Sequence, residues 1–139
     1  MSASDVAVVR RVYDALDGLA GLHNRNFDRI AEECFGPEYA FAFARPGGTG
    51  LEPEYRGLQG FREALDTWME GWEWWETTVE DFVDLGDRGV LVLSRSRGRS
   101  PSGLEVDVKT AEMQEMRDGR MVRTVSYPIR SEALTLYGL

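Results

Sequence analysis

The residue of this sequence with the clearest capacity for chemistry is Glu112, which lies in a predicted strand over residues 104–116. Side chains alternate between the two faces of a strand, so Glu112 shares one face with every second residue. These residues are Val106, Val108, Thr110 and Gln114. A carboxylate that follows two valines on a concave face loses water, which raises its pKa toward neutrality and suits it to act as a general acid or base. The open alternative is a bulge near Ala111 and Met113 that turns Glu112 to solvent or toward an arginine.

Two arginines in the preceding predicted strand are candidates for the same site. Arg95 shares a face with Leu91 and Leu93 by the same alternation, and Arg97 follows two residues later. Opposite charges on facing strands attract. We therefore expect Arg95 or Arg97 to lie near Glu112, either as its ion-pair partner or as an anchor for an anionic group of a ligand.

Aromatic side chains are the second candidate feature. Trp68 and Trp72 are four residues apart and lie on one face of a predicted helix over residues 58–72. We predict that they line an apolar pocket together with residues from other predicted elements. These residues are Tyr13, Phe41, Phe43, Phe61, Arg95, Thr124 and Ser126. The alternative is that the rings pack as an ordinary core; of the adjacent Trp74 and Trp75, alternation along a strand allows only one to face the pocket.

Composition argues against several classes of function. The chain has 24 acidic and 16 basic residues and a formal net charge of -8, which argues against a nucleic-acid partner. It has one histidine, His23, and one cysteine, Cys34, too few for a transition-metal site with the usual ligands. No phosphate-binding loop is present, so we expect neither a metal nor another cofactor. The N-terminus does not read as a signal peptide and no apolar segment is long enough to span a bilayer, which predicts a cytoplasmic protein without membrane contact.

Apolar periodicity predicts helices in the first half of the chain and consecutive strands in the second half. The predicted helices span residues 5–21, 27–35 and 58–72, with a short helical tail over 131–137. The predicted strands span residues 38–44, 76–85, 89–98, 104–116 and 120–128. Helices gathered first and strands afterwards favour one α+β domain over residues 1–139. The segment from Arg45 to Gly57, which contains glycines and prolines, is interpreted as a flap over the pocket mouth.

The order of short motifs along the chain resembles that of a known family. The motifs are Val8-Val9-Arg10-Arg11-Val12-Tyr13, Tyr55-Arg56-Gly57, Gly86-Asp87-Arg88, Arg117-Asp118-Gly119-Arg120-Met121-Val122, Ser126-Tyr127-Pro128 and Glu132-Ala133-Leu134. This order resembles the SnoaL-like branch of the nuclear transport factor 2-like superfamily. The resemblance implies a cone, in which a strongly bent antiparallel sheet packs on three N-terminal helices and leaves a pocket inside. It also implies a homodimer that pairs through the sheet.

The same resemblance implies where acid–base groups would stand. Ketosteroid isomerases use a helix tyrosine, a late-strand acid and a base, and the matching positions here are Val12, Glu112 and Phe43, with Tyr13 one residue from the tyrosine position. Epoxide hydrolases place an aspartate at the position of Ser126. Because Phe43 and Ser126 carry no carboxylate, neither reaction is expected.

Three functions remain open. The first, which the sequence favours, is a small-molecule-binding protein whose pocket takes an apolar or aromatic molecule. The second is a cyclase, isomerase or hydratase that works without a cofactor and uses Glu112 as its general acid or base. The third is a dimerisation module whose cone is filled by its own side chains. The sequence does not decide whether the protein is an enzyme.

Overall fold

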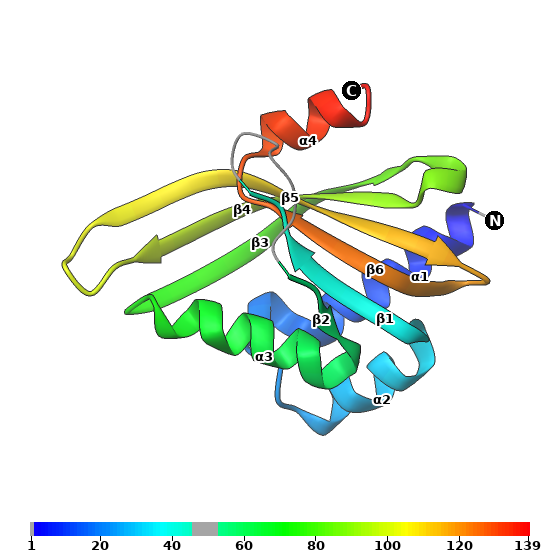
Figure 1. Ribbon diagram of the computed structural model, residues 1–139, viewed down its shortest axis with the longest axis horizontal. Coiled ribbons are helices and arrows are strands. Elements are labelled where there is room, and N and C mark those ends of the chain that lie inside the picture. The colour runs from blue at the N-terminus through cyan, green and yellow to red at the C-terminus, as the bar shows by residue number, and fades with distance from the viewer. Residues whose placement is uncertain (1, 46–52) are drawn as a thin grey trace.

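A computed structural model describes residues 2–45 and 53–139 and shows how the elements are arranged (Figure 1). The helices are α1 (Ser2–Leu16), α2 (Arg25–Cys34), α3 (Gly57–Glu70) and α4 (Arg130–Leu136), with short 3₁₀ turns at Asp17–Leu19 and Gly86–Arg88. The strands are β1 (Phe35–Phe43), β2 (Tyr55–Arg56), β3 (Trp74–Asp84), β4 (Val90–Arg99), β5 (Glu105–Arg117) and β6 (Arg120–Tyr127). The predicted α+β class is confirmed.

The strands form one sheet in the order β2-β1-β6-β5-β4-β3. Strands β3 to β6 are joined in sequence and pair antiparallel, as expected. Strand β1 instead runs parallel to β6, with Phe41 opposite Thr124, so the sheet is mixed and not purely antiparallel. No hairpin joins these two strands, and a long connection leaves either direction open.

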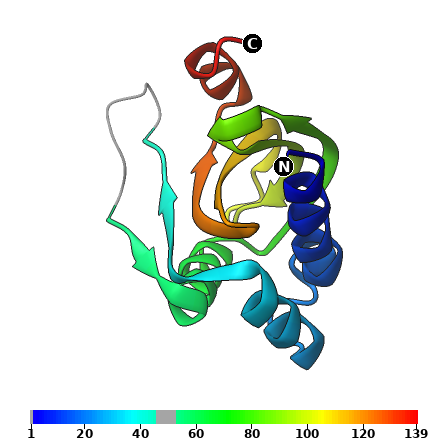
Figure 2. The same cartoon turned by 90° about the vertical axis from the view of Figure 1, so that its right-hand side faces the viewer.

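The sheet is strongly bent, and its concave side faces helices. Figure 2 shows strands β3 to β6 curling into an open arc, with α1 across the open side. Two register shifts contribute to the bending, one between Val79 and Asp81 in β3 and one between Glu115 and Met116 in β5. An extra residue on one strand of a pair bends that strand and increases its twist. The result is the cone that the resemblance implied.

One hydrophobic core fixes the three N-terminal helices on β1. Phe61 of α3 lies among aromatic rings of neighbouring elements, with ring centroids 5.8 Å from Phe27 and 5.6 Å from Phe35. Helix α1 contributes three fully or nearly buried side chains, namely Val9, Val12 and Leu16. A smaller apolar cluster lies on the convex side of the sheet, where Ala133 of α4 packs against Leu91 and Met113.

Element boundaries differ from the predicted ones in two instructive places. Helix α1 ends at Leu16 because Asp17, Gly18 and Leu19 all have positive φ, which no α-helix continues. Strand β1 begins directly after α2, so Gly36-Pro37 lies within the strand and not in a separating turn.

The structure describes part of the predicted flap. Residues 46–52 of it lie outside the described residues. The part that is described is not all loop, because Tyr55–Arg56 forms β2 and pairs antiparallel with β1. No alternation in this segment is long enough to predict a two-residue strand.

Candidate functional site

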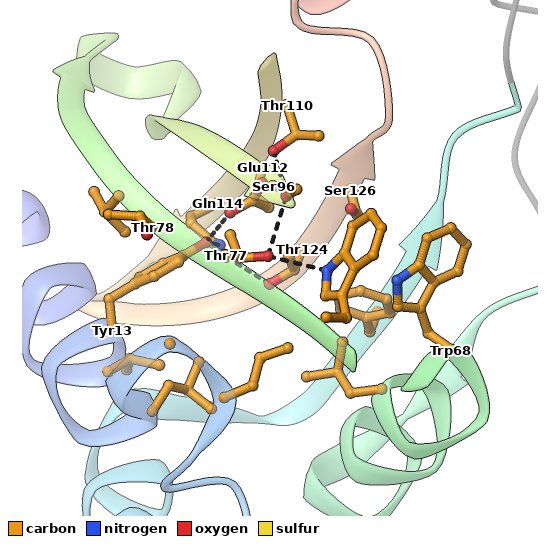
Figure 3. Close-up of a pocket in the computed structure, with 18 of the residues that line it drawn as sticks. Tyr13, Trp68, Thr77, Thr78, Ser96, Thr110, Glu112, Gln114, Thr124 and Ser126 are labelled. Atoms are coloured by element: carbon orange, nitrogen blue, oxygen red, sulfur yellow. Dashed lines mark hydrogen bonds between the residues drawn. The ribbon is translucent and has the colours of Figure 1, made fainter. Parts of the chain in front are cut away.

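A cavity of about 1090 Å³ lies between the concave face of the sheet and helices α1 and α3 (Figure 3). Its volume is at the upper end of the roughly 300–1,000 Å³ that small-molecule sites occupy. Glu112 lines the cavity, as do all predicted pocket residues except Arg95: Tyr13, Phe41, Phe43, Phe61, Trp68, Trp72, Thr124 and Ser126. The five residues predicted to share one face of β5, from Val106 to Gln114, all line it too.

Arg95 was predicted to line the pocket, and the structure places it on the opposite, convex face. Its Nε and Nη2 donate to the carboxylate of Asp107 at 2.7 and 2.5 Å. Leu91 and Leu93, used to assign its face, belong to the apolar cluster beside α4 and not to the cavity. Arg97 likewise pairs outside the cavity, with Glu76 at 3.5 Å. Neither arginine therefore serves as the partner or ligand anchor that we expected near the site.

Glu112 is held by two hydroxyl donors. Tyr13 donates to its Oε1 at 3.0 Å and Ser94 donates to the same oxygen at 3.1 Å. Among residues 2–45 and 53–139, no side chain donates to the second oxygen, Oε2. The alternative of a solvent-facing Glu112 is not observed, because the bulge in β5 comes after Glu115 and leaves Glu112 on the concave face.

Burial raises the pKa of Glu112 from 4.5 to about 7. Hydrogen bonds from Tyr13 and Ser94 favour the ionised form and work against this rise, and so does the nearby positive charge of Arg130. Burial is the larger effect. The carboxyl group therefore exchanges its proton near neutral pH, which is the property a general acid or base needs.

A directed chain of hydrogen bonds leads to Glu112 through the core. Tyr39 donates to Thr124 at 2.6 Å, and Thr124 donates to Oε1 of Gln114 at 2.5 Å. Gln114 then donates from Nε2 to the Tyr13 hydroxyl at 2.8 Å. Since that hydroxyl oxygen already accepts a bond, its own proton is left to go to Glu112. Burial and the Glu112 charge raise the pKa of Tyr13 well above its usual value, so Tyr13 remains a donor.

Sequence reasoning missed two members of this chain. Gln114 was placed on the correct face of its strand but was given no role. Tyr39 was read only as one of the alternating aromatic residues of a short strand. Its contact with Thr124 spans 85 residues, and no local pattern marks it.

Tryptophan rings form one wall of the cavity. The ring centroids of Trp72 and Trp75 are 4.6 Å apart, and Trp68 lies 5.2 Å from Trp75. As alternation predicts, only Trp75 of the adjacent pair faces the cavity, while Trp74 is 38% exposed. Gly98 lies opposite Trp75, and a Cβ there would stand 2.4 Å from its ring. A glycine is therefore required for the indole to lie on the sheet.

Within 2–45 and 53–139, no group of three or more His, Cys, Asp or Glu side chains is placed to hold a metal ion. None of the helices described here is long and apolar enough to cross a membrane.

The sequence model of the SnoaL-like domain family matches residues 9–124, which is most of the chain. The chain belongs to the SnoaL-like domain family. No curated protein matches the chain significantly.

Solved structures share the fold of this SnoaL-like domain. A protein from Jannaschia sp. that is named for its likeness to SnoaL-like polyketide cyclases has a TM-score of 0.70 and 21% identity, covering 96% of this chain and 91% of that one. TerC, co-crystallised with polyporic acid, has a TM-score of 0.66 and 18% identity. The match covers 98% of this chain and 99% of TerC. An NTF2-like protein of unknown function from Burkholderia pseudomallei has a TM-score of 0.67 and 16% identity, covering 98% of each. At these identities the likeness shows the fold alone.

The structure shows which side chains stand at the positions where the family resemblance implied acid–base groups. Phe43 and Ser126 line the cavity and offer no carboxylate there. Val12 is buried, whereas the neighbouring Tyr13 reaches Glu112. Tyr13, one residue from the position that the resemblance implied for a tyrosine, therefore forms a tyrosine–acid pair with Glu112 in this SnoaL-like domain.

Proposed function

We propose that this SnoaL-like domain binds a small, largely apolar aromatic molecule and moves a proton on it, with Glu112 as the acid–base group. The observation that carries the proposal is a carboxyl group with a pKa of about 7 in the wall of an aromatic cavity. Removing a carboxyl group from water costs stability, and only hydroxyl groups of the described residues hydrogen-bond to this one, so its presence in the wall of a cavity lined by aromatic rings favours a chemical role.

The geometry assigns different tasks to the two oxygens of Glu112. Oε1 accepts bonds from Tyr13 and Ser94, which fixes the orientation of the group. The acidic proton then belongs on Oε2. In its ionised form Glu112 removes a proton from a carbon of the ligand, and in its protonated form it returns the proton to the same or another carbon. Isomerisation and ring closure both use such steps, and side chains alone can perform them.

The second candidate is binding without chemistry, and the side chains at Phe43 and Ser126 favour it. Both stand where the resemblance to known enzymes implied a carboxylate. The third hypothesis, a filled cone, is disfavoured by the volume of the cavity. Homodimerisation through the sheet and an apolar or aromatic partner molecule stay predictions.

Proton transfer can be tested with β-tetralone, a bicyclic aromatic ketone whose α-protons exchange with solvent. In deuterated buffer the protein should accelerate this exchange, and the rate should rise with pH and level off above about pH 7 as Glu112 ionises. Proton NMR follows the loss of the α-signal. If calorimetry shows that the ketone binds while its exchange is no faster than in buffer between about pH 5 and about pH 9, only the binding function survives.

A further inference from the structure

The first residue of α4, Arg130, binds three strands of the sheet and does not line the cavity. Its Nε donates to the backbone oxygen of Thr110 at 3.1 Å, and its Nη2 donates to the backbone oxygen of Ser94. Nη2 also donates to Oε1 of Glu80 at 2.6 Å. Figure 2 shows α4 outside the arc that β3 to β6 form. The guanidinium group therefore joins β3, β4 and β5 from the outer side of the sheet.

The place of Arg130 in its helix does not account for this residue. A positive charge in the first turn of a helix opposes the helix dipole. The Arg130 side chain is also only 15% exposed, and arginine is rarely buried unless it is paired. The bonds to the sheet offset both costs. The reason for an arginine at this position therefore lies in the sheet and not in α4.

The two backbone oxygens that Arg130 binds belong to the strands that hold the acid–base group. Ser94 and Thr110 are opposite each other in the pairing of β4 with β5. The hydroxyl of Ser94 donates to Oε1 of Glu112 at 3.1 Å, and Thr110 precedes Glu112 by two residues on the same face of β5. A shift of either backbone segment would move Glu112 relative to its donor. Arg130 thus fixes the frame in which Glu112 is held.

Arg130 also supplies positive charge that the cavity lining lacks. Besides Glu112, the described charged residues of the lining are Arg10, Asp14, Asp17, Glu80 and Asp81, together with the titratable Tyr13. On the outer face of β4 and β5 the charged neighbours are Arg95, Asp107 and Lys109. Acidic residues predominate in the lining, and negative charge disfavours an ionised carboxylate. The charge of Arg130 favours the ionised form of Glu112 and opposes the effect of burial.

We propose that Arg130 is a positioning residue for Glu112, which holds the backbone of β4 and β5 behind the carboxyl group and favours its ionised form from outside the cavity. This inference rests on the proposed proton-transfer function. It gives the C-terminal helix a role in the reactivity of the site. The far end of α4 is fixed too, because the hydroxyls of Tyr127 and Tyr137 lie 3.1 Å apart.

The test is a carbon-13 NMR titration of Glu112 in Arg130→Gln, which keeps an amide donor and loses the charge. The midpoint of Glu112 should rise by about 0.5–1 pH unit, less than the roughly 1–3 units expected of a direct charge partner. The pH at which β-tetralone exchange levels off should rise by the same amount. A merely structural defect would lower the rate at every pH and leave the midpoint in place. An unchanged midpoint in the folded variant overturns the proposal.

Lys109→Gln is the matched control, because Lys109 binds the same Glu80 carboxylate, with Nζ 2.9 Å from Oε2. Its side chain is 59% exposed, so its charge is screened by solvent and its loss should move the midpoint by less than about 0.2 pH unit. Arg130→Lys keeps the charge and loses the planar fork, and its midpoint should stay close to that of the wild type. A rise in either variant as large as that in Arg130→Gln contradicts the role assigned to the Arg130 charge.

Glu80→Gln keeps the proposal testable if thermal melting shows that Arg130→Gln does not fold. This variant leaves the arginine in place and removes its counter-charge. The positive charge that acts on Glu112 is then less compensated, and the midpoint of Glu112 should fall. An unchanged midpoint would count against the proposal.

Failure of this inference can be separated from failure of the proposed function. If the midpoint of Glu112 follows Arg130 but the protein does not accelerate exchange of β-tetralone, the proposed function falls and the effect of Arg130 on Glu112 stands. If exchange requires Glu112 but neither its midpoint nor the pH profile responds to Arg130, the proposed function stands and this inference falls. If Glu112 neither responds to Arg130 nor is required for exchange, both are wrong.

Discussion

Replacing Glu112 with glutamine should slow the protein-catalysed exchange of β-tetralone by about 10²- to 10⁴-fold, the usual contribution of a positioned acid–base group. Glutamine keeps the size of the side chain and its Oε1 acceptor, so the bonds from Tyr13 and Ser94 can persist. Its amide group neither ionises nor takes up a proton near neutral pH, so it cannot act as a general acid or base. Proton NMR in deuterated buffer measures the loss, and calorimetry should show that the ketone still binds.

Glu115→Gln is the matched control, because it makes the same chemical change three residues away on the same strand. Glu115 pairs with Arg123 at 3.1 Å and does not line the cavity. The Glu115→Gln variant should catalyse the exchange of β-tetralone at the same rate as the wild-type protein. Equal rates in Glu112→Gln and the wild type would remove Glu112 from the reaction.

The free energy of unfolding should fall by about 2.5 kcal/mol as the pH rises from about 5 to about 8, because the folded state holds the Glu112 proton more tightly than the unfolded chain does. The pKa of Glu112 is raised from 4.5 to about 7, so its contribution to stability is complete below 4.5. It is lost as the pH passes through about 7. Three exposed acids have lowered pKa values, namely Glu33, Glu80 and Asp107. They change the free energy of unfolding only at lower pH, outside this window.

Urea unfolding at a series of pH values measures this dependence. The Glu112→Gln variant should lose most of the fall between about pH 5 and about pH 8 and should be more stable than the wild-type protein at the upper end. Such a gain is expected of a functional site that holds a destabilising group. Parallel curves for the two proteins would show that Glu112 titrates as an ordinary exposed acid.

Strand periodicity accounts for what could be predicted of this site. Alternation along β5 placed Glu112 on the concave face with Thr110 and Gln114, and helical spacing placed Trp68 and Trp72 together. Both patterns are local, and the bent sheet preserves them.

The wrong prediction for Arg95 has a physical origin. Leu91 and Leu93 made its face of β4 look like the inside of the cone, but α4 covers them on the convex side. Both faces of this strand carry apolar residues near its start, so hydrophobicity alone does not tell them apart. The serines at 94 and 96, which alternate with the arginines, are on the concave side: Ser96 lines the cavity and Ser94 donates to Glu112.

Other features depend on contacts between distant parts of the chain. The bond between Tyr13 and Glu112 joins residues 99 positions apart, and the parallel pairing of β1 with β6 likewise joins two ends of the fold. No turn or spacing specifies such pairings. They follow only once the helices have packed on the sheet.

The most direct measurement is a carbon-13 NMR titration of the Glu112 carboxyl group, assigned by the signal that disappears in Glu112→Gln. The carboxyl shift should change with a midpoint near pH 7, as burial among the cavity residues requires. A midpoint near the ordinary value of 4.5 would show that the carboxylate is solvated and ionised at neutral pH, and it would contradict a proton-transfer role for Glu112.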